Sequence, residues 1–410
     1  MQGQRRWYVV GLLFLAILIN YVDRGNLSIA AVPLMKDFAL SPTQMGLLLS
    51  AFFWTYAGMQ IPAGILIDRY GIRRIYAGSF LLWSLATAAI AWADSFGQIF
   101  ACRMMLGIGE AVAAPASLGY IRRSFRQEES GLPTAVYTAG MMVGPAVGSL
   151  AGALILESVG WRALFLITGL GACWWVIPWL WMAPRGRAED AEAVRPAAAA
   201  IRWKQVFTNP LFWGITIAAF LYSYYWYFFL TWIPSYLLMT HGFSFTAMGT
   251  ATALPLAGMA LVAAAAARLA DGRIARSGRP IETRRAFVTA GFLLGCLMLL
   301  LLVFRSRAAA FPILTVSMLG LGLASANYWA LTQAISPQTM IAKVVAYQNT
   351  IANLAGIVAP IATGRLLGEE KNFDRAIACA GIALLAAAGA YRFLIRPEDV
   401  GRFRADCGDA

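Results

Sequence analysis

The stretch GILIDRYGIRR, residues 64–74, decides the fold, because it sets one aspartate and three arginines directly after a long apolar run. A related stretch, RLADGRIAR at residues 268–276, follows a second apolar run and again holds an aspartate followed by basic residues. Charged residues of this kind are typical of the point where a helix leaves a membrane. Basic residues would mark any cytoplasmic loop, but the matching aspartates, Asp68 and Asp271, indicate a duplicated bundle of helices.

The composition outside these stretches is that of a membrane protein. Of the 410 residues, 60% are hydrophobic and 13% are charged, and the mean hydropathy is +0.65. A chain of this length has too little polar surface to cover a soluble globule. The net charge of +13 lies in short clusters between apolar runs rather than on one basic face, which argues against a nucleic-acid partner. The five cysteines lack metal-ligand spacing and indicate neither a disulfide nor a metal site. We predict no metal and no cofactor.

Twelve apolar runs come close to the roughly 20 residues that span a bilayer as a helix. We therefore predict an all-α membrane protein of twelve transmembrane helices. The predicted spans are residues 7–33, 43–67, 74–93, 97–119, 133–156, 162–183, 209–239, 246–269, 284–304, 308–335, 341–366 and 374–394.

The longest hydrophilic break divides these spans six and six. We predict an N-terminal half at residues 1–183, a cytoplasmic linker at 184–208, and a C-terminal half with a short tail at 209–410. Arginine and lysine concentrate in alternate breaks, which include the linker and the stretches that follow the second and eighth spans. Cytoplasmic loops carry this excess, so both termini are predicted to be cytoplasmic, in a multi-pass protein of the cell (inner) membrane.

Charged residues also occur inside the spans, where they are costly. Asp23 and Arg24 lie in the first span, and Arg103 and Glu110 lie in the fourth. Because a bilayer penalises each such side chain by roughly 2.5 to 3.5 kcal/mol, they indicate a functional site. Arg103 and Glu110 are seven residues apart, so they share one helix face to within about 20°. The alternative is a static buried network.

The depth and direction of these side chains suggest which of them bind the anion and which bind the proton. Asp23 lies about 24 Å along its helix from Trp7, at a depth close to that of Arg103, so those two side chains can pair. Arg24 points about 100° away from Asp23 and is left to bind an anion. Its guanidinium stays charged and forms a fork that matches a carboxylate. Glu110, among glycines and alanines, gains little solvation, so it can bind and release a proton, with Asp23 as the second acid and Arg103 as their partner.

The second half contributes polar and aromatic candidates for binding the rest of a substrate. Amide side chains in the eleventh span could bind hydroxyls or a second carboxylate, although bonds between helices explain them nearly as well. Aromatic residues in the seventh span could line a cavity or form an interfacial belt. The candidates are Trp226, Thr332, Gln348, Asn349 and Asn353.

Over essentially its whole length, the sequence resembles the major facilitator superfamily. The signature of that family between the second and third helices is matched by Gly64, Asp68, Arg69, Gly71, Arg73 and Arg74. More narrowly, the chain resembles the anion:cation symporter family, which includes sugar-acid, phthalate and sialic-acid transporters. This match rests on NYVDRGNL at residues 20–27, on Tyr56 and Gln60, and on the segment from Arg103 to Glu110.

The resemblance implies the major facilitator fold and alternating access between two six-helix halves. It also implies that the signature residues, together with Asp271, form a cytoplasmic gate, that Tyr21 and Tyr56 shape the cavity, and that Asn353 contacts substrate. One departure stands out: sugar-acid members tend to carry a glutamine in helix five, where this chain has Met141 and Met142. A thioether cannot donate to sugar hydroxyls, which argues against a heavily hydroxylated substrate. The aromatic character of the seventh span then favours a less polar or aromatic carboxylate.

We therefore predict a monomer in the lipid bilayer that carries a small organic anion together with a proton. The alternatives are an anion exchanger or exporter with the same charges, or a transport-dead sensor that binds ligand and signals to a partner. Phosphate is a further ligand that arginine would suit. No arrangement of serine, cysteine and histidine indicates catalysis, so an enzyme is not expected.

Overall fold

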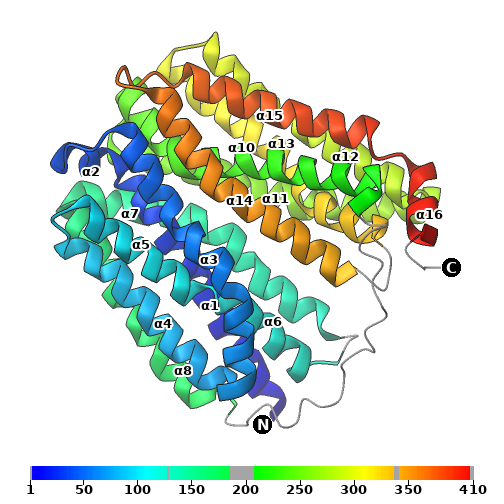
Figure 1. Ribbon diagram of the computed structural model, residues 1–410, viewed down its shortest axis with the longest axis horizontal. Coiled ribbons are helices and arrows are strands. Elements are labelled where there is room, and N and C mark those ends of the chain that lie inside the picture. Colours follow the sequence, from blue (N-terminus) through cyan, green and yellow to red (C-terminus); the bar gives the residue numbers. More distant parts are fainter. Residues whose placement is uncertain (1, 127–128, 185–206, 337–340, 407–410) are drawn as a thin grey trace. The chain divides into compact units, whose positions relative to one another are not determined.

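The computed structural model describes residues 2–126, 129–184, 207–336 and 341–406 (Figure 1). Within these ranges all regular elements are helices, so the all-α prediction is confirmed. Most of the predicted linker, residues 185–206, lies outside the described part of the chain, as do its basic residues.

The described residues up to position 184 form the first six predicted spans. Ser41 begins the second span with a capping box, in which its hydroxyl accepts from the Gln44 backbone N–H and the Gln44 side chain accepts from the Ser41 N–H. The fifth and sixth spans share one helix, broken at Gly160, whose φ of +81° is not helical. The elements are α1 (Gln2–Ile29), α2 (Ala31–Asp37), α3 (Pro42–Tyr70), α4 (Ile72–Ala89), η1 (Ile90–Trp92), α5 (Phe96–Glu110), α6 (Ala113–Ser124), α7 (Gly131–Ala172), η3 (Cys173–Trp175) and α8 (Val176–Met182).

The remaining described residues form the other six spans. Each predicted span coincides with one helix or with consecutive helices, and a short final helix, α16, lies in the tail, where no span was expected. Nine described stretches are long and apolar enough by themselves to cross a membrane. The elements are α10 (Pro210–His241), α11 (Phe245–Ser277), α12 (Pro280–Gly295), η5 (Cys296–Leu302), α13 (Arg307–Ile335), α14 (Ile341–Leu367), α15 (Asp374–Phe393) and α16 (Pro397–Asp406).

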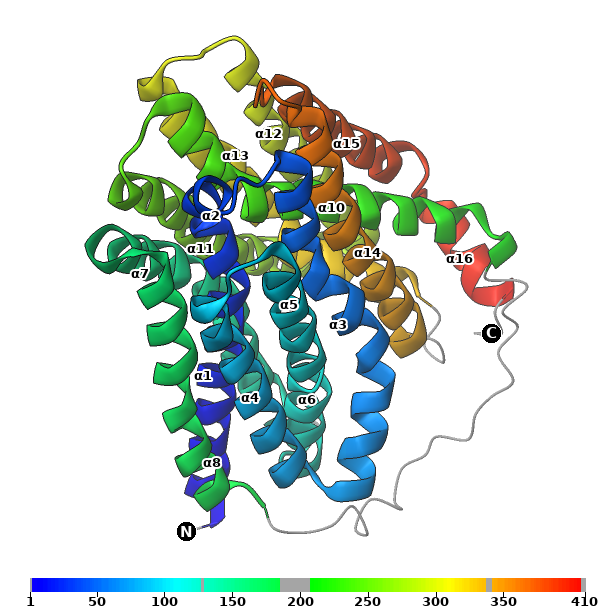
Figure 2. The same cartoon turned by 60° about the vertical axis from the view of Figure 1, so that its left-hand side comes forward.

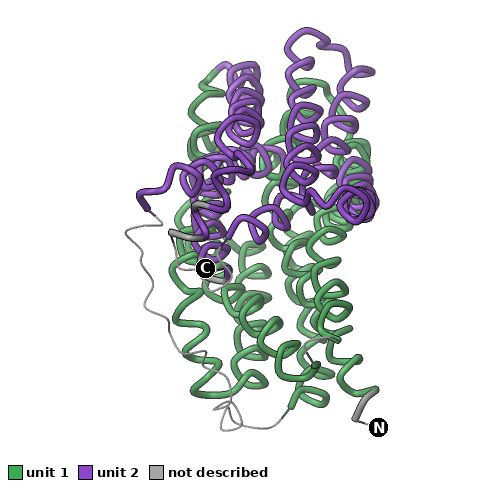
Figure 3. The backbone as a smooth tube through the Cα atoms, turned by 90° about the vertical axis from the view of Figure 1, so that its right-hand side faces the viewer, with its two compact units in different colours: residues 1–194, 230–253, 360–369 green, residues 195–229, 254–359, 370–410 purple. Residues whose placement is uncertain are grey.

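The chain divides into two compact units, which Figure 3 colours separately. Unit 1 contains Met1–Val194, Leu230–Ala253 and Pro360–Glu369, and unit 2 contains the rest. Three helices therefore pass from one unit to the other: α10, α11 and α14. Each contains a proline close to the boundary, and these are Pro234, Pro255 and Pro360. A division into two six-helix halves at the linker stays a prediction.

Unit 1 is held together by buried aromatic rings between its helices. Figure 2 shows α1, α4, α5 and α8 running side by side. The ring of Phe80 stacks on that of Trp175 with centroids 4.2 Å apart, and Trp175 stacks in turn on Trp179 at 5.0 Å. The Trp175 Nε1 atom donates to the Leu12 carbonyl of α1 at 2.7 Å. This packing fixes α1, which carries the charged residues of the first span, against the helices that surround it.

Candidate functional site

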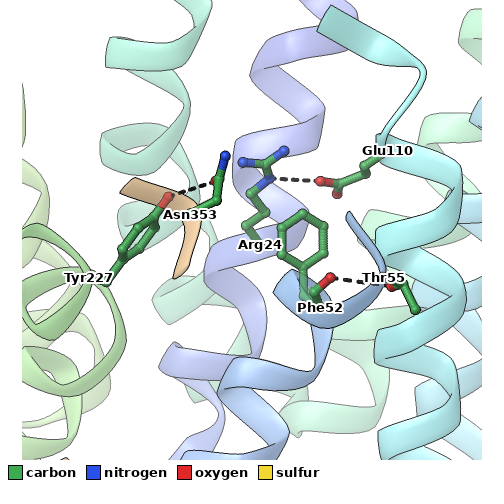
Figure 4. Close-up of polar contacts among 6 residues, drawn as sticks. All are labelled: Arg24, Phe52, Thr55, Glu110, Tyr227 and Asn353. Carbon is green, nitrogen blue, oxygen red and sulfur yellow. Dashed lines mark hydrogen bonds and ion pairs between the residues drawn. The ribbon is translucent and has the colours of Figure 1, made fainter. Parts of the chain in front are cut away.

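The centre of the candidate site is an ion pair between α1 and α5. The Arg24 Nε atom donates to the Glu110 Oε2 atom at 2.7 Å (Figure 4). The Glu110 side chain is 0% exposed and that of Arg24 is 15% exposed. A charge-assisted bond of this length is a strong one. The arginine is therefore the member of the pair that a molecule from outside can reach.

Aromatic rings surround the Arg24 guanidinium. Its Cζ atom lies 4.8 Å from the ring centroid of Tyr21, 4.6 Å from that of Phe52 and 4.6 Å from that of Tyr56. These distances are within the range of cation–π attraction. The Phe52 and Tyr56 rings also stack on each other, with centroids 5.0 Å apart and planes at 27°. The predicted residues Tyr21, Arg24 and Tyr56 are thus brought together, with Phe52 as a member that the sequence reasoning missed.

The position of Phe52 follows from the way α3 meets α5. A Cβ atom on Gly107 of α5 would collide with the Phe52 backbone oxygen, so glycine is needed for the two helices to approach this closely. The Thr55 hydroxyl donates across the same contact to the Met104 carbonyl at 2.7 Å, and it lies 3.3 Å from the Phe52 carbonyl (Figure 4). Phe52 and Tyr56 are four residues apart and so share a helix face, which is the signal that could have identified Phe52.

The predicted pairing of Asp23 with Arg103 is wrong. Both side chains are buried, but among the described residues no ion pair within 4.0 Å joins them. The Asp23 Oδ1 atom accepts a long bond of 3.5 Å from the Asn26 amide. The Asp23 Oδ2 atom and the Arg103 Nε and Nη1 atoms have no hydrogen-bond partner in the described part of the chain. Arg103 instead lies over the Phe52 ring, with its Cζ atom 5.7 Å from the centroid.

This difference changes the expected roles at the site. Arg24, which the sequence left unpaired, holds the one carboxylate that is ion-paired here, and Arg103 is left without a carboxylate partner. Each buried polar group without a partner costs about 1 to 3 kcal/mol, more when it is charged. An unpartnered buried charge in a native structure calls for an explanation, and a functional role is one such explanation.

Unit 2 contains the other substrate-binding candidates. The Asn353 Oδ1 atom accepts from the Tyr227 hydroxyl at 3.4 Å (Figure 4). The Asn353 amide donates to the Asn349 carbonyl at 2.9 Å. Gln348 is fully buried, and neither of its amide atoms has a hydrogen-bond partner among the described residues. Thr332 is buried with an unpartnered hydroxyl in the same part of the chain. Tyr227 was missed in favour of the half-buried Trp226 beside it, although both belong to one aromatic run.

The predicted gating residues take part in contacts at helix ends. The Asp68 carboxylate pairs with Arg123 at 3.2 Å, and Asp271 pairs with Arg284 at 2.9 Å. The turn between α3 and α4 is made at Gly71, whose φ is +83°. Neither Arg123 nor Arg284 was singled out from the sequence, although both belong to the basic clusters that set the orientation.

The other signature residues have more local surroundings. Arg69 lies over the ring of the adjacent Tyr70, with its Cζ atom 5.2 Å from the centroid. Arg73 donates from Nε to the Leu180 carbonyl at 3.0 Å, whereas Arg74 is exposed. Gly64 is half-buried within α3.

Comparisons with known proteins agree with this architecture. The model of the Major Facilitator Superfamily matches residues 13–360. The probable L-galactonate transporter of Escherichia coli (strain K12) is 29% identical over 404 residues, which cover 94% of this chain and 88% of that protein. The hexuronate transporter of Bacillus subtilis (strain 168) is 29% identical over 405 residues, covering 95% and 94%. These relatives confirm the resemblance to the anion:cation symporter family that was stated from the residues.

A solved structure shows the same fold. A bacterial homolog of the human lysosomal transporter Spinster, in an inward-facing and occupied conformation, superposes with a TM-score of 0.78 at 20% identity, covering 95% of this chain and 96% of that one. That likeness bears on the fold alone. The match to the family model covers most of the sequence, and the relatives are transporters rather than enzymes. The chain therefore belongs to the Major Facilitator Superfamily.

Proposed function

We propose that this protein is a symporter that carries a small organic anion together with a proton, by alternating access between two six-helix halves. The observation that carries the proposal is the buried ion pair between Arg24 and Glu110, in which the arginine is the more exposed partner. Names of relatives support a carboxylate as the anion, since they include transporters of L-galactonate, hexuronate and galactarate/D-glucarate.

The ion pair supplies a simple route to coupling. While Glu110 is ionised it occupies the Arg24 guanidinium, so a substrate carboxylate must compete with it. A proton that binds to Glu110 removes its charge, weakens the pair and frees Arg24 for the substrate. Anion and proton then enter together, and the charge of the site is the same before and after. The empty form has a salt bridge between Arg24 and Glu110, whereas the loaded form has one between Arg24 and the anion. Because these salt bridges differ, the two forms favour different conformations of the protein.

Asp23 and Arg103 form the second part of the proton-coupling machinery. Both are buried beside the ion pair, on α1 and α5, and both carry polar atoms without a partner in the described residues. When Asp23 is protonated, the charge of Arg103 is uncompensated. When Asp23 loses that proton, its negative charge attracts Arg103. We assign these residues to coupling rather than to contact with the substrate.

Further residues would bind the rest of the substrate. We assign this role to Trp226, Thr332, Gln348, Asn349 and Asn353, with Tyr21 and Tyr56 beside the carboxylate. The rings around Arg24, together with Met141 and Met142, favour a carboxylate with fewer hydroxyls than a sugar acid carries. The protein would act as a monomer in the cell membrane, with both termini in the cytoplasm and the signature residues as a cytoplasmic gate.

Transport by the purified protein in liposomes tests the proposal. Acid uptake is recorded with a panel of sugar acids, aromatic carboxylates and phosphate, for the native chain and for Glu110→Gln. We expect one class of anion to move protons in the native protein. The variant should bind and exchange that anion without responding to a pH gradient, because glutamine cannot take up the proton.

The matched control is Glu370→Gln, which makes the same chemical change at an exposed position between α14 and α15. It should behave as the native protein does. Anion exchange without any proton movement in the native chain would favour an exchanger. Binding without transport would favour a sensor, and either result would refute the coupling.

A further inference from the structure

We propose that Phe52 is a positioning residue that keeps Arg103 away from Arg24 and Glu110. Glu110 then pairs with Arg24 alone. The inference rests on the function proposed for this site and names a residue that neither the family signature nor the charge pattern singles out. Its basis is geometric: one fully buried ring lies next to both guanidinium groups.

The contacts of the ring are unequal but both are close. The Arg24 Cζ atom lies 4.6 Å from the Phe52 centroid and the Arg103 Cζ atom lies 5.7 Å from it. Cations within about 6 Å of a ring centroid are attracted by its electron-rich face. Phe52 therefore holds each guanidinium while it occupies space that either side chain could otherwise enter. Figure 4 shows the ring beside the Arg24 side chain.

The separation matters because this site pairs one carboxylate with one of two cations. Arg103 is on the same face of α5 as Glu110, two turns earlier, and its Nε and Nη1 atoms have no acceptor among the described residues. A smaller apolar side chain at position 52 would open a route for Arg103 toward that carboxylate. A second arginine there would hold Glu110 in its ionised form and oppose the proton uptake that frees Arg24.

The ring is mounted so that it cannot drift from this place. It stacks on Tyr56, with planes at 27°, and meets the edge of Phe53 at 4.9 Å. Its backbone is pressed against Gly107, where any side chain would collide with the Phe52 oxygen. One turn later, the Thr55 hydroxyl is bonded to Met104 on the same helix as Glu110. These contacts fix the ring relative to α5, which carries both Arg103 and Glu110.

The charged and titratable groups that contact the ring, or that neighbour those that do, come from four helices. From α1 these are Tyr21, Asp23 and Arg24; from α3, Tyr56; from α5, Arg103 and Glu110; and from α7, Tyr137. We assign the pH response of transport to the two carboxyls, of which Glu110 pairs with Arg24 and Asp23 has no arginine of the described residues within ion-pair distance. Phe52 acts on that response through the arginines.

The test compares Phe52→Leu with two other variants in liposome uptake. Phe52→Tyr keeps the ring. Phe80→Leu removes an equally buried ring from the same unit, one that stacks on Trp175. We expect Phe52→Leu to raise the KM for the anion about fivefold, the equivalent of one lost cation–π contact. Half-maximal uptake should also move to more acid pH by about one unit, as a second arginine near a carboxyl produces.

Phe52→Tyr should keep the KM within about twofold of that of the native chain and leave the pH of half-maximal uptake unchanged. Phe80→Leu should lower protein yield or maximal rate and leave the KM and the pH of half-maximal uptake unchanged. If Phe52→Leu shows the same pattern as Phe80→Leu, the ring is ordinary core packing and the proposal is overturned.

A second measurement does not depend on any anion. Thermal unfolding is followed in detergent for Phe52→Leu, Arg103→Met and the double variant. If the ring and the guanidinium interact, Arg103→Met should lower the melting temperature by about 2 °C less when Phe52 is already leucine. Strictly additive changes would refute the contact. Absence of anion uptake by the native chain would instead refute the proposed function, and it would leave this thermal result to decide the role of Phe52.

Discussion

At the scale of single residues, the site depends on the chemistry of one guanidinium. Arg24 is in contact with a carboxylate and three aromatic rings at once. A planar, weakly hydrated cation suits both kinds of partner, because it stacks on a ring and still offers a fork of donors in its own plane. An ammonium would carry the same charge, but it could neither stack on a ring nor offer a planar fork of donors.

Substitution of Arg24 by lysine should therefore weaken anion binding although the charge is kept. We expect the dissociation constant to rise at least about tenfold, because the bidentate contact and the stacking are both lost. Isothermal titration of the purified protein with the transported anion measures this. Arg162→Lys is the matched control, since Arg162 also lies over a ring, that of Trp161, outside the candidate site. Equal affinity in Arg24→Lys and the native chain would rule out Arg24 as the carboxylate ligand.

How much of the site could be predicted from the sequence also becomes clear at this scale. The four charged residues were identifiable because charge inside an apolar run is costly wherever it occurs. Their pairing was not, since the 100° rule gives the direction of a side chain on its own helix but not how two helices are rotated toward each other. Asp23 and Arg103 were therefore paired wrongly. Phe52 carries no charge and resembles any other core residue until α3 and α5 are brought together.

At the scale of helices, arginines of both units donate to carbonyls at or just after the ends of other helices. Arg73, at the start of α4, donates to the Leu180 carbonyl near the end of α8 at 3.0 Å. Arg285, near the start of α12, donates to the Ile395 carbonyl just after α15 at 2.8 Å. The last carbonyls of a helix have no partner within it, so Arg73 satisfies a carbonyl that α8 itself leaves open. Arg285 satisfies a carbonyl of the segment that follows α15. The similarity predicted from Asp68 and Asp271 is thus accompanied by a matching arginine at the start of the next helix, Arg73 in α4 and Arg285 in α12.

Removal of one of these arginines should destabilise the protein. Arg73→Ala leaves the Leu180 carbonyl without its donor, and we expect the melting temperature in detergent to fall by several degrees, the equivalent of about 1 to 3 kcal/mol. The neighbouring Arg74 is exposed, so Arg74→Ala should change it by about 1 °C or less. Similar losses in both variants would show that general charge, rather than the helix end, is responsible.

A carboxylate plays the complementary role at the start of α11. Glu157, exposed and between the fifth and sixth predicted spans, accepts the Thr246 backbone N–H at 2.6 Å. Hydrogen bonds from the Thr246 side chain and backbone lower the pKa of Glu157 from its ordinary value of 4.5. An acid whose pKa is lowered by folding stabilises the protein above its ordinary pKa, and this contribution is lost as the pH falls through the lowered value.

The expected outcome is a pH-dependent difference between Glu157→Gln and the native chain. Glutamine imitates the protonated acid, so the variant should melt at a lower temperature at pH 7. The two melting curves should converge as the pH falls below 4.5 and through the lowered pKa of Glu157. Thermal scans at a series of pH values check this. A difference that persists unchanged into acid would mean that the charge of Glu157 contributes nothing.

At the scale of the whole molecule, the apolar runs and the clusters of arginine were enough to predict twelve spans, because membrane thickness dictates helix length. Which segments of the chain make up unit 1 could not be predicted from the sequence. Unit 1 includes the later segments 230–253 and 360–369, which pack where α1 ends and α3 begins. The Ser28 hydroxyl donates to the Thr231 carbonyl at 2.7 Å, and a Cβ atom on Gly46 would collide with the Pro360 oxygen. Such contacts depend on shape, which hydropathy does not record.

A methyl group at Gly46 should loosen this end of unit 1. We expect Gly46→Ala to raise the rate at which a water-soluble thiol reagent labels a cysteine placed at position 28, in a chain freed of its other cysteines. Gly58→Ala is the control, because a Cβ atom there meets nothing within 4 Å. Unchanged labelling in Gly46→Ala would show that the contact with Pro360 does not hold this end closed.

The three helices that belong to both units have one further property. Pro234, Pro255 and Pro360 each lie within about one turn of the residue where α10, α11 or α14 passes between units. Proline lacks the N–H that would bond to the carbonyl four residues earlier, so the backbone ladder is already open at each of these points. Bending there breaks fewer bonds than bending elsewhere in the same helices. Within the interior of these helices, amide hydrogen exchange should accordingly be fastest in the turn next to each proline. The three turns next to these prolines would then be the places where these helices bend.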